Sequence, residues 1–566
     1  MEKLGGEQTC DEGVENMVNP GQAVQDGGQA EYGQVEYGRA EYRAEDACAA
    51  ELLCDRHPGE AVAFRIVGDD LSTRELTFGE LTTRSTRIAA VLAERGVRRG
   101  DAVGVLMGKS AELPAVLLGI WRLGAVHIPL FTAFARPAIE MRLDGGDARV
   151  VVADADQVDK LDADAGRRVL QVGGAVPTTP GRERLDDALA AADDAPAAEP
   201  VRVGGDGTLV LLFTSGTTGT PKGVPVPVRA LASMERYLLD ALDVRPDDVF
   251  WNAADPGWAY GLYYGILAPL ALGRTSILLH AGFSPALTWR VLETFGVTNF
   301  AAAPTIYRAL RGEQSEAGTS VRLRCASSAG EPLTPEVVGW SSDALGAEVR
   351  DHYGQTEHGM VVGNLWKPEL KADVVPGSMG FALPGWSCAV LADDADEPVR
   401  PGTVGRLAID VEGSPMMWFG GYAGAPERTA ERFTADGRWY LTGDTAYQDE
   451  DGRLYFSSRD DDVIIMAGYR IGPFDVESVL VGHEAVLEAA VIGAPDELRG
   501  EVLEAYVVLR QDAEPTPELE SELQQQVKRE FAAHAYPRRV HVVETLPKTP
   551  SGKIQRFKLR EQHAAE

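Results

Sequence analysis

Long apolar runs are missing from this 566-residue chain. The longest mostly apolar stretch, Tyr260 to Gly273, is broken by Gly261, Gly265 and Pro269. It is shorter than the roughly 20 residues that cross a bilayer, so we expect no membrane span. The N-terminus also lacks a basic segment followed by an apolar run, so we expect no signal peptide.

Cysteines and basic residues are scarce. Five cysteines without any C-x-x-C pair make zinc, redox and disulfide roles weak, and a reducing cytoplasm is the simplest compartment. The 86 acidic residues outnumber the 54 basic ones, which gives a net charge of -32. This balance argues against binding of nucleic acid or anionic membranes. A site for an anionic ligand must therefore gather its cations locally.

The length requires more than one hydrophobic core. Residues 1–43 are rich in Gly, Glu, Gln and Ala with a crude Glu-Tyr-Gly repeat, and they predict a disordered acidic tail. Residues 44–460 predict an N-terminal domain and residues 461–566 a small C-terminal α/β domain. The charged break at Ser458 to Asp462 marks the boundary between them.

Strands alternate with helices in the N-terminal domain. The composition predicts strands at 61–67, 102–106, 150–153 and 168–172, a helix capped by Thr77 with Glu80 as its capping box, and a helix at 111–123. This alternation predicts an α/β fold with doubly wound parallel-type sheets. Residues 174–206 look like a surface connection, and short strands with glycine turns over about 376–458 predict a β-rich subdomain.

The C-terminal domain has one strongly marked helix. Thr516 predicts its N-cap, with Pro517 at the first position. Four apolar residues at a spacing of four predict its buried face: Leu519, Leu523, Val527 and Phe531.

A glycine- and threonine-rich loop follows the buried strand Leu209 to Phe213. The loop runs from Thr214 to Gly223 and contains Lys222. Backbone N–H groups, hydroxyls and a lysine in this arrangement favour polyphosphate binding. It is not a Walker A loop, because Pro221 precedes the lysine and no Ser or Thr follows it.

Two further stretches suit a nucleotide. The sequence Ser328 to Pro332 is a small-residue turn that a flat ligand could approach closely. The segment 349–359 delivers Tyr353, Thr356 and Glu357 within five residues, a set that could stack on a base, bind a phosphate and hold Mg²⁺.

Seven ordered motifs from about residue 44 to the C-terminus resemble the adenylate-forming superfamily of acyl-CoA synthetases, adenylation domains and luciferases. They are TSGTTGTPKG, SAGEPL, YGQTE, YLTGD, SRDDDVI, AGYRIGPFDVES and PKTPSGKI. The resemblance implies ATP, Mg²⁺ and coenzyme A as ligands. It also implies that a carboxylate attacks the α-phosphorus of ATP, that CoA then displaces AMP, and that the C-terminal domain is mobile between these steps.

The resemblance also implies residue roles. The phosphate loop would comprise Thr214, Ser215, Gly216, Thr217, Thr218 and Lys222. Gly330, Glu331 and Pro332 would contact adenine with Tyr353 stacked on it, and Gly354 and Gln355 would also bind the nucleotide. Thr356 would bind the α-phosphate, Glu357 the Mg²⁺, and Asp444 the ribose with Arg459 beside it. The catalytic lysine would be Lys553, Arg470 would meet the phosphates, Gly468 would lie on the path of the CoA thiol, and Asp461 would be the hinge.

The acid is the open question. Acetyl-CoA synthetases commonly carry a Trp where this chain has Gly354, and that Trp closes a small acyl pocket. We therefore expect a medium-chain or aromatic acid, in a pocket that includes Trp258, Tyr260, Tyr263 and Gly354. Because the aromatic residues could narrow the pocket again, acetate or propionate is the alternative.

Other functions and partners stay open. An adenylation enzyme that loads a carrier protein and a non-catalytic nucleotide-binding regulator are the two rivals. Homo-oligomerisation is open, and a further hypothesis is that acylation of Lys553 switches the enzyme off, as in some bacterial relatives.

Overall fold

The computed structural model describes residues 39–175, 179–192, 199–214, 221–313, 320–460, 462–466, 469–496, 500–511, 513–532, 534–549 and 553–565. Among these residues, no helix combines the length and the apolar character that a membrane crossing requires.

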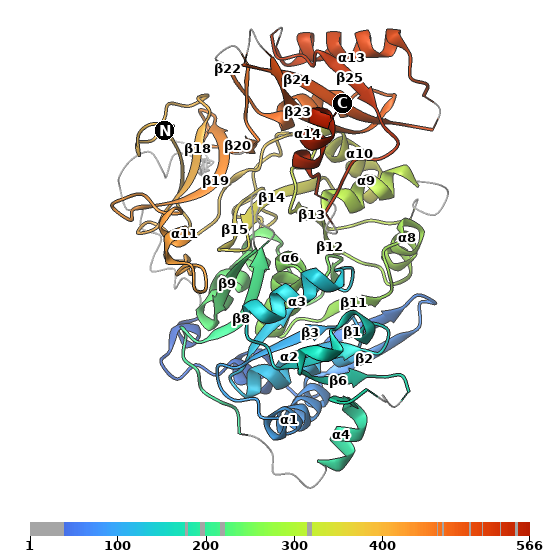
Figure 1. The fold of residues 1–566 in the computed structure, drawn as a ribbon, viewed down its shortest axis with the longest axis vertical. Helices are drawn as coiled ribbons and strands as arrows, with labels where there is room; N and C mark the ends of the chain where they lie inside the picture. The colour runs from blue at the N-terminus through green and yellow to red at the C-terminus, as the bar shows by residue number, and fades with distance from the viewer. Residues whose placement is uncertain are drawn as a thin grey trace, which may run out of the picture. The chain divides into compact units, whose positions relative to one another are not determined.

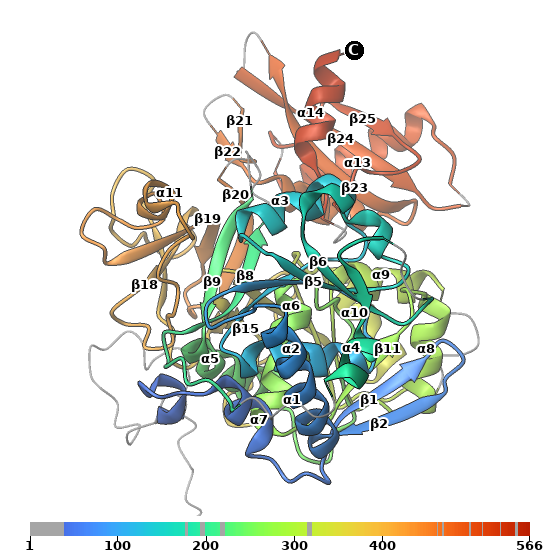
Figure 2. The same ribbon diagram turned by 60° about the horizontal axis from the view of Figure 1, so that its bottom comes forward.

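A seven-stranded sheet in the order β7-β6-β5-β3-β4-β8-β9 is parallel except for the last pair. Helices α1 (Phe78–Glu94) and α2 (Glu112–Arg122) pack on one face and α3 (Arg136–Gly145) on the other, with β5 and β6 between them (Figure 2). The strands are β3 (Ala102–Leu106), β4 (Val126–Pro129), β5 (Val150–Asp154), β6 (Arg168–Val172), β7 (Arg182–Arg184), β8 (Thr208–Thr214) and β9 (Lys222–Pro227).

A nine-stranded sheet has the order β16-β15-β14-β13-β12-β10-β11-β1-β2, with a parallel centre and antiparallel edges. Its strands are β1 (Val62–Gly68), β2 (Thr73–Thr77), β10 (Phe250–Asn252), β11 (Ser276–His280), β12 (Asn299–Ala302), β13 (Cys325–Ala329), β14 (Val349–Gln355), β15 (Gly359–Gly363) and β16 (Phe381–Ala382). One face carries α8 (Pro285–Thr294), α9 (Pro304–Gly312) and α10 (Pro335–Leu345). The other carries α5 (Leu231–Arg236), α6 (Ala259–Leu262) and α7 (Ala268–Leu272). Both large sheets are thus doubly wound, as the sequence predicts.

Two smaller sheets follow. The first is antiparallel and comprises β17 (Cys388–Leu391), β18 (Gly405–Asp410), β19 (Trp439–Gln448) and β20 (Leu454–Arg459), with α11 (Pro426–Ala430) between two of its strands in the chain. The second comprises β21 (Ile464–Met466), β22 (Tyr469–Ile471), β23 (Val486–Asp496), β24 (Gly500–Leu509) and β25 (Arg539–Val542). On this second sheet, α12 (Pro473–Val481) and α13 (Pro517–Glu530) cover one face and α14 (Arg556–Ala565) the other (Figure 1).

The two predicted helix starts are confirmed. The Thr77 hydroxyl accepts the Glu80 backbone N–H, and the Glu80 carboxylate accepts the Thr77 N–H, which completes the capping box. The Thr516 hydroxyl accepts the Leu519 N–H at the start of α13. Each cap satisfies a donor that the first helical turn leaves without a partner.

Three expectations need correction. Phe531 is not part of the buried face of α13, because the helix ends at Glu530 and the Phe531 side chain is 42% exposed. The stretch 174–206 is not a plain connection, since it contains β7 and the helix α4 (Leu185–Ala191), which buries Leu185 and Leu189. Tyr42 does not belong to a disordered segment, because it is fully buried and donates a hydrogen bond to Glu235; the rest of the predicted tail, residues 1–38, lies outside the described residues.

Candidate active site

A large cavity with a volume of about 1810 Å³ collects residues from all four sheets and the segments between them. Pockets for one small molecule usually measure about 300–1,000 Å³, so this cavity has room for more than one substrate. Of the predicted site residues whose side chains are described, these line it: Thr214, Lys222, Trp258, Tyr260, Tyr263, Gly330, Glu331, Pro332, Tyr353, Gly354, Gln355, Thr356, Glu357, Asp444, Arg459 and Lys553. The others lie outside what the structure describes: Ser215, Gly216, Thr217, Thr218, Asp461, Gly468 and the side chain of Arg470.

The end of β14 meets the middle of β19 at Asp444. The Tyr353 hydroxyl donates to Asp444 Oδ2 at 2.5 Å, and the Gln355 amide donates to the same oxygen at 2.7 Å. The other oxygen, Oδ1, lies 3.4 Å from Arg459 Nε. Asp444 is only 4% exposed, so these three partners hold its carboxylate at the cavity wall. Burial beside Asp444 raises the pKa of Tyr353, which keeps this phenol a donor.

Glu357 joins a second polar network. Its Oε1 accepts the Tyr422 hydroxyl at 2.8 Å, and Arg432 Nε donates to that hydroxyl at 3.2 Å. The Lys222 ammonium lies 4.8 Å from the centre of the Tyr422 ring. Desolvation, Arg432 and Arg428 together lower the pKa of Lys222, while Glu357 opposes them. One carboxylate, Glu357, and one phenol, Tyr422, thus lie among three cations at one end of the cavity.

Two of these cations were not predicted. Arg428 belongs to α11 and Arg432 follows it by one helical turn, and both line the cavity. The two arginines are four residues apart and follow a glycine-rich segment, but this spacing alone does not indicate a phosphate site. Taken alone, the PERTAER stretch is typical of a solvated helix, and only its placement beside Lys222 gives it a role.

The turn after β13 combines an open backbone with a paired carboxylate. Gly330 has a φ of +104°, which disfavours any side chain there, and a Cβ would meet only open space. Glu331 accepts a hydrogen bond from Arg308 at 3.0 Å. The backbone is therefore exposed to the cavity at the place that the sequence assigned to a flat ligand.

Lys553 reaches the cavity from the C-terminal sheet. Its backbone N–H donates to the Thr549 hydroxyl at 3.0 Å, and the Thr549 N–H donates to the Lys553 carbonyl at 2.7 Å. Desolvation lowers the pKa of the Lys553 amine, and Arg459 lowers it further. The carboxylates of Glu331, Asp444 and Glu357 act in the opposite direction. The lysine therefore shares the cavity with the predicted adenine, ribose and metal residues.

An aromatic wall bounds another part of the cavity. The Tyr263 hydroxyl donates to the Thr356 carbonyl at 3.1 Å, and the Tyr264 hydroxyl accepts the Met360 N–H at 2.8 Å. A Cβ on Gly354 would lie 2.2 Å from the Gly359 carbonyl oxygen. Gly354 therefore packs directly on the backbone of β15, and no side chain projects from this position into the cavity.

The sequence matches the model of the AMP-binding enzyme over residues 51–421 and that of the AMP-binding enzyme C-terminal domain over residues 475–553. This chain belongs to the AMP-binding enzyme family. It is 37% identical to acetyl-coenzyme A synthetase of Bacillus subtilis over 86% of this chain and 84% of that protein. It is 34% identical to a mitochondrial acyl-coenzyme A synthetase of Mus musculus, with coverages of 86% and 84%.

A solved AMP-binding enzyme is closer in sequence. The crystal structure of Brucella canis acyl-CoA synthetase has 45% sequence identity and a TM-score of 0.71, and the match covers 92% of this chain and 94% of that chain. The chain is an acid–CoA ligase of the adenylate-forming superfamily, and its reaction is AMP-forming acyl-CoA synthesis with ATP, Mg²⁺ and CoA.

The residues present fit Mg²⁺. Glu357 is 7% exposed and lines the cavity, as do the cations Lys222 and Arg432. A carboxylate oxygen is the hard ligand that Mg²⁺ prefers, and phosphate oxygens of a nucleotide commonly complete its shell.

Proposed function

We propose that the acid is larger than acetate, either medium-chain or aromatic. The observation that carries this proposal is that Gly354 lines the cavity without a side chain. The wall beyond it consists of the aromatic faces of Tyr260, Tyr263 and Tyr264, whose hydroxyls point to partners in the protein. A wall of this kind suits an apolar acyl group.

Charge neutralisation is the main task of the first half-reaction, because a carboxylate must attack the α-phosphorus of an anionic nucleotide. Lys222, Arg428 and Arg432 would hold the β- and γ-phosphates, and pyrophosphate leaves toward them. Tyr353 and Asp444 would position the adenosine, and Thr356 would bind the α-phosphate. Mg²⁺ held by Glu357 would supply further positive charge to the phosphates. In the second half-reaction, the CoA thiolate attacks the acyl carbon and AMP leaves.

Lys553 is assigned to the first half-reaction. Its ammonium would bridge the attacking carboxylate and a phosphate oxygen as negative charge moves from one to the other. We expect Lys553→Ala to lose at least about a hundred-fold in ATP–pyrophosphate exchange, by analogy with the removal of one oxyanion-hole donor. Much of the thioester formation from supplied acyl-adenylate should remain.

Lys548→Ala is the matched control, because Lys548 lies in the same loop but pairs with Glu488 at 2.5 Å. We expect it to change neither half-reaction by more than a few-fold. Equal loss of both half-reactions in Lys553→Ala would show that the lysine has a different role.

The acid class is tested with a panel of acetate, propionate, butyrate, hexanoate, octanoate and benzoate, read by pyrophosphate release. The proposal expects the highest kcat/KM for one of the last three acids. A highest value for acetate would show that Gly354 does not set the acyl pocket.

Acetate or propionate is the second candidate, because the Bacillus subtilis relative is named acetyl-coenzyme A synthetase. The same panel separates the two candidates. A thiolation assay that compares CoA with a carrier protein addresses the alternative acceptor.

Finer points of the reaction remain proposals. We infer that acylation of the Lys553 amine would remove its charge and stop adenylation, and full activity in protein stoichiometrically acetylated there would contradict this. The domain boundary at 460/461, the hinge at Asp461, a homo-oligomeric state and a cytoplasmic location stay predictions.

A further inference from the structure

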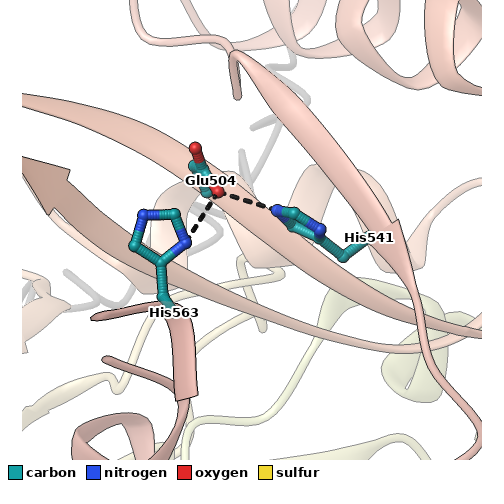
Figure 3. Close-up of side chains that lie close together, drawn as sticks. All are labelled: Glu504, His541 and His563. Atoms are coloured by element: carbon teal, nitrogen blue, oxygen red, sulfur yellow. Dashed lines mark hydrogen bonds and ion pairs between the residues drawn. The ribbon is translucent and has the colours of Figure 1, made fainter. Parts of the chain in front are cut away.

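Two histidines and a glutamate meet on the C-terminal sheet, away from the active site. Glu504 lies on β24, His541 on β25 and His563 on α14 (Figure 3). Strands β24 and β25 are parallel neighbours, with Tyr506 opposite His541. Residues two apart on a strand share a face, so Glu504 and Tyr506 both point to the side that α14 covers. None of the three residues lines the active-site cavity.

The three groups converge closely. His541 Nε2 lies 2.7 Å and His563 Nδ1 lies 3.3 Å from the same oxygen, Glu504 Oε2 (Figure 3). One ligand atom from each of the three residues lies within 4.8 Å of the other two. Glu504 is 5% exposed, and the histidines are half-buried.

The buried nitrogen of His563 needs a partner. Within the described part of the chain, His563 Nδ1 makes no hydrogen bond, although it faces the carboxylate oxygen. An unprotonated imidazole nitrogen and a carboxylate oxygen both present lone pairs, so their approach is favourable only with a cation between them. That cation is either a proton or a metal ion.

The donor set favours a metal. Two imidazole nitrogens and one carboxylate oxygen bind Zn²⁺ in tetrahedral sites that keep a fourth position for water. Mg²⁺, which the reaction uses, prefers oxygen ligands, so the two ions would not compete strongly. Metal–ligand bonds of about 2.0–2.1 Å place tetrahedral ligands roughly 3.3 Å apart. Glu504 and His563 already have this separation, and a small rotation of His541 would open its shorter contact to match.

A neighbouring ring supports the geometry. The Tyr506 ring stacks on His541 with a centroid distance of 4.6 Å and an angle of 18°. Such a contact fixes the plane of a ligating imidazole, as second-layer groups commonly do in metal sites.

We propose that Glu504, His541 and His563 bind a divalent transition metal ion, with Zn²⁺ as the probe. The ion would fasten the last turn of α14 to the sheet. The first residue of α14, Arg556, follows Lys553 by three positions, so this helix supports the loop that carries the lysine. The site would be structural and separate from the Mg²⁺ of the reaction.

The test uses the full chain stripped with a chelator and titrated with ZnCl₂ by calorimetry in excess Mg²⁺. We expect one Zn²⁺ site per chain that the double variant His541→Ala/His563→Ala lacks. Glu504→Gln, which keeps the side-chain shape, and His541→Asn, which removes the ligating Nε2, should each weaken it at least about ten-fold. His534→Ala is the matched control, because His534 is an exposed histidine of the same domain and should leave binding unchanged.

Hydrogen exchange provides a readout that activity cannot supply. Zn²⁺ should slow exchange of the α14 amides in the wild-type protein and in His534→Ala, but not in the double variant. Absence of the Zn²⁺ site in the wild-type protein would overturn the proposal and assign a proton to the cluster. Equal Zn²⁺ binding by the double variant, or unchanged α14 exchange in the wild type, would overturn it as well.

Discussion

Burial decides the protonation of single residues around the cavity. Asp351 is 8% exposed, and among the described residues its Oδ1 has no hydrogen-bond partner, while Oδ2 accepts the Leu333 N–H at 3.4 Å. Desolvation raises the pKa of this carboxyl to about 8. The same burial lowers the pKa of the adjacent His352 to about 4. At neutral pH both groups are therefore uncharged, although both line the cavity.

The raised pKa of Asp351 makes stability depend on pH. Because the folded chain keeps a proton that the unfolded chain releases, stability falls as pH rises from about 4 to about 8. Asp351→Asn cannot ionise and therefore does not lose this stability. The melting temperature of the variant minus that of the wild type should increase as pH rises from 5 to 8. The measurement is the difference in Tm across this range.

Asp436→Asn is the control for this effect. A hydrogen bond from Thr434 lowers the pKa of the exposed Asp436, so it stays ionised between pH 5 and 8. Its Tm difference from the wild type should be constant across this range. A constant difference for Asp351→Asn too would mean that Asp351 is ionised in the folded protein.

Gly354 gives a second prediction for a single residue. Gly354→Ala places a Cβ against the Gly359 carbonyl, so we expect a loss of about 1–3 kcal/mol in stability from overpacking. Activity should fall with every acid, without a shift in preference. Denaturant unfolding and the acid panel measure the two effects.

Gly339→Ala in α10 is the control, since its Cβ meets open space. A change in acid preference without loss of stability would contradict the close packing on β15.

At the level of elements, local signals in the sequence identified the helix starts and the central strands. The capping box at Thr77 and the cap at Thr516 depend only on nearby residues, so sequence alone could find them. The end of α13 could not be found, because apolar spacing continues to Phe531 although the helix stops. Helix α14 buries one aliphatic residue, Leu559, and therefore has no apolar stripe to detect.

In the candidate site, too, local motifs could be found from the sequence, whereas contacts between distant segments could not. The motifs predicted residues that share one cavity, because described residues of all seven motifs line it. The contribution of Arg428 and Arg432 depends on α11 lying beside Lys222, a long-range contact that no local pattern contains. The cluster of Glu504, His541 and His563 likewise depends on pairing between β24, β25 and α14.

Arg556 anchors the first turn of α14. It donates to both oxygens of the buried Glu477 at 2.9 and 2.7 Å and to Asp462 at 3.2 Å. Arg556→Ala leaves a buried carboxylate uncompensated, which costs about 3–5 kcal/mol. We expect a lower melting temperature and slower ATP–pyrophosphate exchange, because the loop with Lys553 loses its support.

Arg560→Ala is the comparison for this anchor. Arg560 pairs with Asp462 at 2.9 Å, and its side chain is 37% exposed. Loss of such an exposed pair should cost less than about 1 kcal/mol. Similar effects of the two variants would show that the pair with Glu477 does not stabilise the helix.

At the scale of the whole molecule, the protein and its ligands carry net charge of the same sign. A chain with a net charge of -32 must bind ATP and CoA, which are anions themselves. The long-range field of the protein cannot attract them, so binding depends on cations within one Debye length, about 8 Å at physiological salt. Lys222, Arg428 and Arg432 are gathered at one end of the cavity and meet this requirement.

Arg428→Ala tests this balance. Removal of one charge-assisted contact to phosphate weakens binding by about 1.5–3 kcal/mol, so the KM for ATP should rise at least about ten-fold. The stability should change little, since Arg428 is exposed. Arg438→Ala is the matched control, because Arg438 lies over Trp439 with its side chain 59% exposed and does not line the cavity. Steady-state kinetics with varied ATP measures both variants. An equal KM in the two variants would mean that Arg428 does not contact the phosphates, and that the other cations of the cavity overcome the acidic background of the protein.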